Sequence, residues 1–374
     1  MSPRLLGGIR GNPLLRGADR YVGIPLVAAA GALKRRRRWP EDVRRIGVLN
    51  ATSIGDTVVL SPVVRDIAAA FPDATTTLFT STTNLPLVEG LEGVEAAPIR
   101  IASPRDALQT IRASRLDVVL DFDSWPRIEP IYCMLSGARF AAGFCAPGQH
   151  RHYWYDAVAE HSPRSHELEN FRRLAGAIGV VSGSLPRLEP SGTLPDDLAP
   201  PEPYVVFHLW PTGISSELKE WPQDRWRRLA TELVERGNTI VLTGSPADAP
   251  ATQAFVDGTP ELAERLVNGA GRYDLGQIVD LVCGSRCVVS VNTGVMHIAA
   301  AAGVPTVALN GPTSERRWGP VGERAVSVNS ELPGCGYLYF GWEYDGERRD
   351  CMEGISVARV LEAVLGLIGE RLPA

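Results

Sequence analysis

Two segments of this chain place small and polar residues where an apolar run passes into a helix-like run. The first, at residues 44–70, reads RRIGVLNATSIGDTVVLSPVVRDIAAA and brings Ser53, Gly55 and Asp56 to the predicted helix start. The second, at residues 291–320, reads VNTGVMHIAAAAGVPTVALNGPTSERRWGP and brings Thr293 and Gly294 to the corresponding place. In α/β proteins, such a turn presents backbone N–H groups and the helix dipole to a phosphate.

The two helix starts predict different chemistry. The start at Thr293-Gly294 is uncharged and suits a phosphate, and the ring of His297, one turn further on, is predicted to point back toward it. Asp56 would repel a phosphate, so we expect it to accept a proton as a general base. The alternative for Asp56 is a helix cap that accepts backbone N–H groups. The alternative for His297 is an ordinary surface or core histidine.

A third segment supplies a cation. Residues 204–244 contain a predicted strand, a polar loop in which Lys219 precedes Trp221-Pro222, a helix and a second strand. A fixed ammonium group beside aligned N–H donors can neutralise the charge that grows on a departing diphosphate. Lys219 is therefore the predicted partner of the phosphate site, and this scheme requires no metal.

Taken in order, these segments resemble glycosyltransferase family 9, the heptosyltransferase family of envelope polysaccharide assembly, over about residues 44–365. The resemblance implies the GT-B fold, in which two Rossmann-like, doubly wound parallel-sheet domains face a central cleft. It implies an inverting, metal-independent transfer of a heptose or related sugar without a cofactor. The implied donor is a nucleoside-diphosphate sugar, ADP-heptose-like, and the implied acceptor is a lipid-linked envelope glycan such as lipopolysaccharide core.

The resemblance also implies a role for each residue of its motifs. Asp56 and Lys219 are the implied catalytic groups. Contacts to the donor are implied for Thr212, Asn292, Thr293, Gly294, His297, Gly311, Pro312 and Thr313, and acceptor-side contacts for Ser53 and Gly55. One position departs from the family, which usually has Asp where this chain has Asn292. The uncharged amide changes the contact expected with hydroxyl groups of the donor sugar.

Asp121-Phe122-Asp123 has the spacing with which other nucleotide-sugar enzymes hold a divalent metal. Here the two carboxylates end an apolar strand-like run, LDVVLDFD. We therefore interpret them as a strand end rather than a metal site.

Two other functions stay open at this point. The first alternative is a nucleotide-sugar-binding protein without turnover, in which Asn292 marks the lost activity. The second is an epimerase-type enzyme on the same fold. A Rossmann dehydrogenase is disfavoured, because residues 50–55 do not supply the G-x-G-x-x-G turn.

Length and composition suit two α/β domains. The chain has 374 residues, 44% of them hydrophobic, with 37 Gly and 29 Pro, and strands alternate with helical stretches. We predict an N-terminal extension at 1–43, an acceptor domain at 44–185, a linker rich in Pro, Gly and Ser at 186–203, and a donor domain at 204–374. The last helix, about 356–368, is expected to pack back across the domain interface, as in the fold that the chain resembles.

The N-terminal extension is basic, whereas the rest of the chain is acidic. Residues 1–45 hold eleven Lys/Arg and three Asp/Glu, and the other residues hold 27 and 40. The uncharged run at 21–33 is too short to span a bilayer and precedes the basic run at 34–38. We expect residues 21–38 to contact an anionic membrane, placing a cytoplasmic protein at the inner face of the cell membrane. The alternative is a disordered or packed extension. Nucleic acid is not an expected partner.

Six cysteines are scattered along the chain, and we expect reduced thiols, as in a cytoplasmic protein. Cys283 and Cys287 have helix spacing, but no second close pair completes a zinc set. Cys335 and Cys351 lie in an irregular C-terminal segment and could be neighbours.

Overall fold

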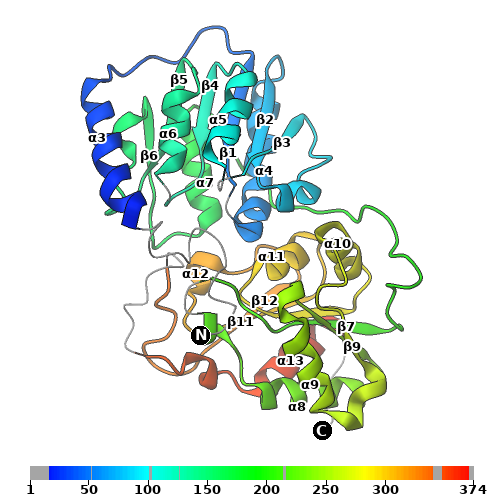
Figure 1. Ribbon diagram of the computed structural model, residues 1–374. Helices are drawn as coiled ribbons and strands as arrows, with labels where there is room; N and C mark the ends of the chain where they lie inside the picture. The colour runs from blue at the N-terminus through cyan, green and yellow to red at the C-terminus, as the bar shows by residue number, and fades with distance from the viewer. Residues whose placement is uncertain are drawn as a thin grey trace. The chain divides into compact units, whose positions relative to one another are not determined.

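A computed structural model describes residues 17–51, 53–100, 103–125, 127–213, 216–339 and 348–369. The chain divides into two compact units between Pro186 and Arg187. Each unit has its own six-stranded sheet, and every strand pairing in both sheets is parallel. The predicted fold class, two doubly wound parallel sheets, is confirmed (Figure 1).

The N-terminal unit alternates strands and helices. Its strands are β1 (Arg45–Leu49), β2 (Thr75–Thr80), β3 (Val94–Pro98), β4 (Val118–Asp121), β5 (Phe140–Cys145) and β6 (Ala157–Glu160). Its helices are the π-helix η2 (Asp19–Gly23), α3 (Ile24–Leu33), α4 (Ile54–Ala70), α5 (Pro104–Ala113), α6 (Ile128–Leu135) and α7 (Glu167–Gly176), with short 3₁₀ turns η3 (Thr82–Leu87) and η4 (His152–Trp154).

The strand order of the N-terminal sheet is β3-β2-β1-β4-β5-β6. The chain therefore runs outward from β1 in one direction, then returns to β4 and runs outward in the other. The carboxyl ends of β1 and β4, at Leu49 and Asp121, are paired neighbours. Ligands of open α/β folds bind at such a reversal, which we call the switch point.

The C-terminal unit repeats this plan. Its strands are β7 (Tyr204–His208), β8 (Thr239–Thr243), β9 (Leu266–Asn268), β10 (Cys287–Val291), β11 (Thr306–Asn310) and β12 (Ala325–Asn329). Its helices are α8 (Gln223–Val234), α9 (Ala249–Asp257), α10 (Leu275–Cys283), α11 (Gly294–Ala301), α12 (Glu315–Trp318) and α13 (Val357–Ile368), with 3₁₀ turns η5 (Ser216–Lys219), η6 (Pro246–Asp248), η7 (Pro260–Arg265) and η8 (Cys351–Gly354).

The C-terminal sheet has the order β12-β11-β10-β7-β8-β9, so its switch point lies between β7 and β10. The five residues of β7, β8, β10 and β11 are all buried, as expected for central parallel strands covered on both faces. The apolar face of α13, with Val360, Val364 and Leu365, belongs to the hydrophobic core of this unit together with Trp221 and Trp226. That face is therefore occupied within the C-terminal unit.

The segment between α7 and β7, residues 177–203, has no helix or strand. Carboxylates from the two units hold it at two places. Asp66 on α4 accepts hydrogen bonds from the hydroxyl groups of Ser182 and Ser184, both at 2.6 Å. Asp280 on α10 accepts a hydrogen bond from the backbone N–H of Ser191 at 2.7 Å. These contacts fix where the segment leaves one unit and where it joins the other.

The N-terminal extension packs on its unit through one side. The ring of Trp39 stacks on Phe71, with ring centroids 5.4 Å apart, and meets Phe140 edge-on at 5.1 Å. Val27 of α3 is fully buried. Helix α3 lies outside the β6 edge of the sheet (Figure 1). The alternative of a packed extension is thus observed for this side of residues 17–40. Among the described residues, no helix is long and apolar enough to cross a membrane.

Candidate functional site

Helix α4 begins at the switch point of the N-terminal unit. Its cap is Ser53, whose hydroxyl oxygen accepts a hydrogen bond from the backbone N–H of Asp56 at 3.0 Å. The interpretation of Asp56 as the cap is therefore wrong, because the serine three residues earlier does that work. Asp56 lies in the first helical turn and is 6% exposed. Gly55 lies between them.

A buried polar chain holds this helix start. The Thr57 hydroxyl donates to the side-chain oxygen of Asn50 at 3.2 Å and to the carbonyl of Ser53 at 2.9 Å. The amide of Asn84, from η3, donates to the Thr57 oxygen at 2.8 Å. Asn84 lies 28 residues from Asp56 in the sequence, so sequence reasoning missed it. These contacts hold the loop and the first helical turn that carry Asp56.

The Asp121–Asp123 pair lies across the switch point, and its carboxylates are occupied by protein groups. Arg151, which is fully buried, is 2.5 Å from Asp121, and the Tyr155 hydroxyl also donates to that carboxylate. Arg151 also donates to the Asp123 carbonyl, and the Asp123 carboxylate accepts the backbone N–H of Ala51 at 3.3 Å. The pair therefore ties the end of β4 to the loop that precedes α4. The interpretation of a strand end agrees with this arrangement.

A further carboxyl group lies beside this pair. Glu129, on α6, is 1% exposed, and among the described residues neither of its carboxyl oxygens has a hydrogen-bond partner. Burial, together with the charges of Asp123 and Asp121, raises the pKa of Glu129 well above its ordinary value. Burial therefore favours the neutral, protonated form of the Glu129 carboxyl group. No feature of the sequence distinguishes it from a surface glutamate.

The other helix start, at α11, carries no charged side chain in its first turn. Thr293 is its cap residue, and its hydroxyl lies 3.1 Å from that of Ser290. Gly294 opens the helix. His297, one turn on, is 6% exposed. An eight-residue helix with an uncharged start leaves its dipole available to an anion.

Lys219 lies in the loop that follows β7, the other strand of the same switch point. It ends η5, and its ammonium group donates to the carbonyl of Thr212 at 2.9 Å. The structure therefore brings together Thr212 and Lys219, which were predicted to have separate roles. Trp221 anchors the end of this loop, since its indole N–H donates to the carbonyl of Ile355 at 2.9 Å.

His208 ends β7 at the same switch point. Its Nδ1 lies 2.9 Å from the hydroxyl oxygen of Thr243, and burial lowers the pKa of His208 to about 4. The imidazole is therefore neutral at pH 7. The sequence analysis did not single out His208, although its place at the end of an apolar strand was a usable signal.

The amide of Asn292 is fixed by two acceptors. Its Nδ2 donates to the side-chain oxygen of Asn310 at 3.0 Å and to the carbonyl of Trp318 at 2.9 Å. Asn310 in turn donates to the Ser327 hydroxyl at 3.0 Å. Since both N–H bonds point to protein acceptors, Asn292 offers its side-chain oxygen to any ligand. An aspartate at this position would face the Trp318 carbonyl without a proton to donate.

Gly311, Pro312 and Thr313 follow β11 and contact a segment near the C-terminus. The Gly311 carbonyl accepts the N–H of Gly336 at 3.0 Å, and the Pro312 carbonyl accepts the N–H of Leu338 at 2.8 Å. A Cβ atom on Gly311 would lie 2.3 Å from the sulfur of Met352. The glycine is therefore required by close packing in addition to any contact with a ligand.

A pocket of about 190 Å³ opens between these elements. Six of its nine lining residues have polar side chains; the lining residues are Asn310, Gly311, Thr313, Ser314, Glu315, Asn329, Ser330, Cys335 and Gly336. Hydroxyl, amide and carboxylate groups in one small cavity suit a ligand rich in hydroxyl groups.

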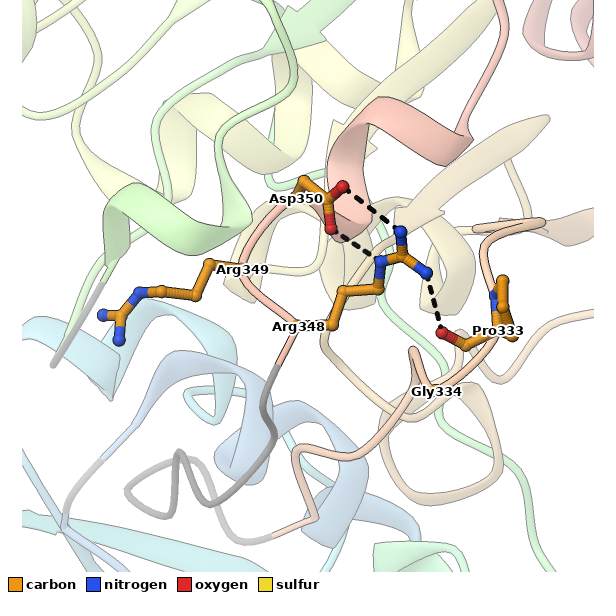
Figure 2. Close-up of a pocket in the computed structure, with 5 residues that line it drawn as sticks. All are labelled: Pro333, Gly334, Arg348, Arg349 and Asp350. Atoms are coloured by element: carbon orange, nitrogen blue, oxygen red, sulfur yellow. Dashed lines mark hydrogen bonds and ion pairs between the residues drawn. The ribbon is translucent and has the colours of Figure 1, made fainter.

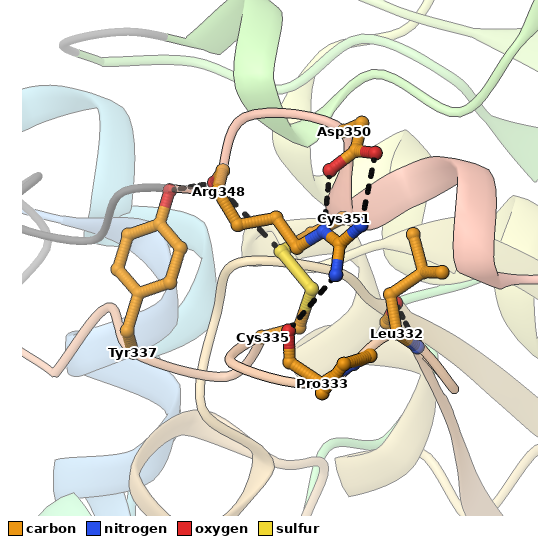
Figure 3. The surroundings of a disulfide bond; sticks show 8 residues. Leu332, Pro333, Cys335, Tyr337, Arg348, Asp350 and Cys351 are labelled. Atoms are coloured by element: carbon orange, nitrogen blue, oxygen red, sulfur yellow. Dashed lines mark hydrogen bonds and ion pairs between the residues drawn. A yellow bond between two sulfur atoms is a disulfide. The ribbon is translucent and has the colours of Figure 1, made fainter.

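A disulfide bond joins Cys335 to Cys351 beside this pocket (Figure 3). The expectation of reduced thiols is therefore wrong for this pair. The physical reason is that Gly336 and Met352, their next neighbours, both pack on Gly311, which brings the two Cα atoms to 5.6 Å. Cys283 and Cys287 do not share a helix, because the first ends α10 and the second begins β10.

A second pocket, of about 630 Å³, is lined by Pro333, Gly334, Arg348, Arg349 and Asp350 (Figure 2). Arg348 donates to Asp350 at 2.7 Å and to the Pro333 carbonyl at 3.1 Å. Arg349 points away from that pair. Arg348 therefore stabilises the loop that carries the disulfide.

The predicted residues fall into one group at each switch point. Ser53, Gly55 and Asp56 belong to the N-terminal group. Thr212, Lys219, Asn292, Thr293, Gly294 and His297 flank the C-terminal switch point, with Gly311, Pro312 and Thr313 on the next strand.

Comparison with known proteins matches the part of the chain that holds the second group. Residues 181–335 match glycosyltransferase family 9 (heptosyltransferase). The lipooligosaccharide heptosyltransferase 2 of Haemophilus influenzae is 38% identical over 111 residues, which are 29% of this chain and 32% of that protein. The lipopolysaccharide heptosyltransferase 2 of Escherichia coli is 34% identical over 151 residues, 40% of this chain and 43% of that protein. The matches thus span less than half of the length of these curated relatives.

The solved structure of E. coli ADP-heptose lipopolysaccharide heptosyltransferase II aligns with 87% of this chain and 98% of that chain. Its TM-score is 0.69 at 23% identity, which shows a shared fold, GT-B, over both units. The resemblance predicted from the sequence is confirmed over residues 181–335, which match the model of glycosyltransferase family 9.

Proposed function

We propose that this protein is a glycosyltransferase that moves a heptose or related sugar to a lipid-linked envelope glycan, such as the core of lipopolysaccharide. The proposal is carried by one observation: a family 9 domain whose switch point joins an uncharged helix start to a lysine. The donor is a nucleoside-diphosphate sugar of the ADP-heptose type, a class named for the E. coli neighbour.

The donor diphosphate binds at the start of α11. The N–H groups of the first helical turn, headed by Gly294, and the hydroxyl of Thr293 supply hydrogen-bond donors, and the helix dipole adds positive potential. Lys219 supplies a full positive charge. Since the Thr212 carbonyl holds the ammonium group at 2.9 Å, the charge is fixed before the donor binds. Negative charge that grows on the departing diphosphate is neutralised there.

The acceptor hydroxyl loses its proton to Asp56. Ser53 caps α4, so the backbone N–H of Asp56 has its partner in Ser53 rather than in the aspartate's own carboxylate. One displacement by the activated hydroxyl inverts the anomeric carbon. The acceptor hydroxyl forms the new C–O bond, the bond to the diphosphate breaks, and the proton passes to the Asp56 carboxylate.

We propose further that transfer proceeds without a metal ion or other cofactor. The support is that Lys219 and the α11 start provide the positive charge that a metal would otherwise bring. In addition, Asp121 is neutralised by the buried Arg151, so the Asp121–Asp123 pair does not need a cation.

A lipid-linked acceptor resides in a bilayer. We therefore propose that the protein works in the cytoplasm at the inner face of the cell membrane and contacts the anionic surface through residues 21–38.

The proposal is tested by incubating the purified protein with a panel of nucleoside-diphosphate sugars, with and without a lipopolysaccharide acceptor that lacks heptose. The expected result is acceptor-dependent release of nucleoside diphosphate from ADP-heptose and a product inverted at the anomeric carbon. Binding of the donor without turnover under every condition would leave a nucleotide-sugar-binding protein. Recovery of an epimerised nucleotide sugar without release of nucleoside diphosphate would indicate an epimerase.

A further inference from the structure

The described part of the N-terminal extension has an exposed apolar side. Tyr21, Val22, Leu26 and Leu33 are 78%, 63%, 46% and 88% exposed. Val22, Leu26 and Leu33 recur at intervals of four and seven residues, which places them along one side of η2 and α3, and Tyr21 directly precedes Val22. Pro25, Ala29 and Ala32, at intermediate positions, are also exposed. We call this stripe the outer face of α3.

The opposite side fixes the orientation of the helix. Asp19 pairs with Arg127 at 2.5 Å, and a Cβ on Gly23 would lie 2.8 Å from the Cβ of Arg127. A Cβ on Gly31 would lie 2.6 Å from the backbone of Tyr153. Two glycines therefore let α3 lie directly on its unit. With this side buried, the apolar residues of the outer face remain turned to the surroundings.

The basic run that follows is divided in the same way. Lys34 and Arg37 pair with Asp156 at 2.9 and 3.2 Å, and the Asp156 carboxylate is fully buried. Arg35, Arg36 and Arg38 are exposed. Two of the five basic residues thus attach the segment to the protein, and three positive charges stay on the surface next to the outer face.

We propose that the outer face of α3, together with Arg35, Arg36 and Arg38, is a contact surface for an anionic lipid bilayer. Apolar side chains beside guanidinium groups match the acyl boundary and the phosphate layer of such a membrane. With ten residues, α3 is about 15 Å long, so it suits the interface and not a span. The assignment deepens the proposed function, which supplies the reason for a membrane location.

The test is co-sedimentation of the full chain with vesicles of phosphatidylcholine alone and of phosphatidylcholine mixed with phosphatidylglycerol. We expect binding to the anionic vesicles at low salt and release at high salt. Val22→Ser/Leu26→Ser and Arg35→Gln/Arg36→Gln should each lower the partition coefficient about tenfold or more. The matched controls, Val181→Ser/Leu185→Ser and Arg105→Gln/Arg112→Gln, change the same residue types at other exposed positions and should bind as wild type does.

Equal binding to neutral and anionic vesicles, or equal losses in the controls, would overturn the assignment. A second outcome would also overturn it: a wild-type protein that is dimeric and does not bind vesicles, and that becomes monomeric in Val22→Ser/Leu26→Ser. In that case the outer face would contact a second copy of the chain. The vesicle measurement uses neither donor nor acceptor. A protein that binds vesicles but transfers no sugar would therefore refute the proposed function and leave this surface standing. Point variants are preferable to deletion of residues 1–40, which would also remove the packed Trp39.

Discussion

The two switch points have the same strand order and opposite chemistry. At the N-terminal one, the buried carboxyl groups of Asp121, Asp123 and Glu129 lie near the buried guanidinium of Arg151, and Asp56 lies in the first turn of the helix that follows β1. The C-terminal one has a neutral histidine, a neutral amide and an uncharged helix start, with one lysine beside them. Topology therefore determines where a site forms, whereas the side chains at the strand ends determine what it can do.

The helix starts show the difference most clearly. Both α4 and α11 direct a positive dipole end toward the carboxyl edge of their sheet. In α4 the protein supplies the complementary negative charge itself, as Asp56 in the first turn. In α11 it supplies none. The α11 start is therefore the one that could accept an anion such as a phosphate.

The largest expected effect follows from removing the charge at α4. Asp56→Asn should lower the rate of transfer about 10²–10⁴-fold, since a positioned base contributes on that order. The affinity for the nucleoside diphosphate, measured by calorimetry, should stay within about twofold, because that site lies on the C-terminal sheet. Asp73→Asn, an exposed change of the same type just after α4, is the control. Transfer within a few-fold of wild type would remove Asp56 from the reaction.

Removing the charge of Lys219, in the C-terminal unit, should lower the rate of transfer nearly as much. Lys219→Ala should lower transfer about 10²–10³-fold, as the loss of a preorganised charge donor does, and should weaken nucleoside diphosphate binding. Wild-type activity should persist in EDTA. Lys34 and Lys219 are the chain's two lysines, so amine labelling offers a direct measurement. Nucleoside diphosphate should protect Lys219 and leave the labelling of Lys34 unchanged. Activity lost to EDTA and restored by Mg²⁺ would refute the metal-free scheme.

The buried titratable groups of the two units should make stability depend on pH in opposite directions. In the C-terminal unit this group is His208. The pKa of His208 is lowered to about 4 by burial, from 6.5, so the unfolded chain binds the proton more readily. Stability should therefore fall as the pH drops from 6.5 to 4, by up to about 1.4 kcal/mol per pH unit. His208→Gln should flatten this acid limb in urea unfolding curves. If His208→Gln leaves the loss of stability at acid pH unchanged, the imidazole is solvated in the folded protein.

Glu129 should give the reverse dependence in the N-terminal unit. Its raised pKa means that the folded protein holds a proton that the unfolded chain releases. Stability should therefore fall as the pH rises above the ordinary glutamate value, again by up to about 1.4 kcal/mol per pH unit until the folded pKa is reached. Glu129→Gln should remove this slope and gain stability relative to wild type at pH 8. A variant less stable than wild type at pH 8 would show that the carboxylate is charged and paired.

The smallest effect concerns the fixed amide. Asn292→Asp places a carboxylate against the Trp318 carbonyl, which should cost about tenfold in kcat/KM, the worth of one misplaced hydrogen bond. The loss should appear with the intact sugar donor and not in the affinity for the free nucleoside diphosphate. Asn292→Ala, which removes both hydrogen bonds without adding charge, separates the two causes. Higher activity in Asn292→Asp than in the wild type would show that an aspartate at this position contacts the donor sugar better than the amide does.

Much of this architecture was predictable because it depends on local patterns. The apolar runs at 204–208, 239–243 and 287–291 predict strands, and β7, β8 and β10 have these bounds to the residue. The helix starts at Gly55-Asp56 and Thr293-Gly294 were recognisable because glycine and a polar residue follow a strand directly. Predicted boundaries differ mainly at helix ends: the sequence predicts helices at 167–178 and 224–236, and α7 and α8 each end two residues earlier.

What the sequence did not predict depends on contacts between distant strands. Asn84 fixes the α4 start from η3, and Arg151 neutralises Asp121 from a loop thirty residues away. The amide chain from Asn292 through Asn310 to Ser327 crosses three strands. None of these partners has a local pattern, because hydrogen bonding across a sheet depends on strand order and register, which emerge only in the folded chain.

The disulfide has a consequence for the covalent connectivity of the chain. A protease that cuts once between Cys335 and Cys351 would leave the final helix, α13, linked to the rest of the protein through sulfur. Such a product would migrate as one chain on a non-reducing gel and as two after reduction. Since α13 contributes Val360, Val364 and Leu365 to the C-terminal core, a protein nicked in this span would keep that helix at an effective concentration that a separate peptide does not reach. Here a single cut need not release a fragment.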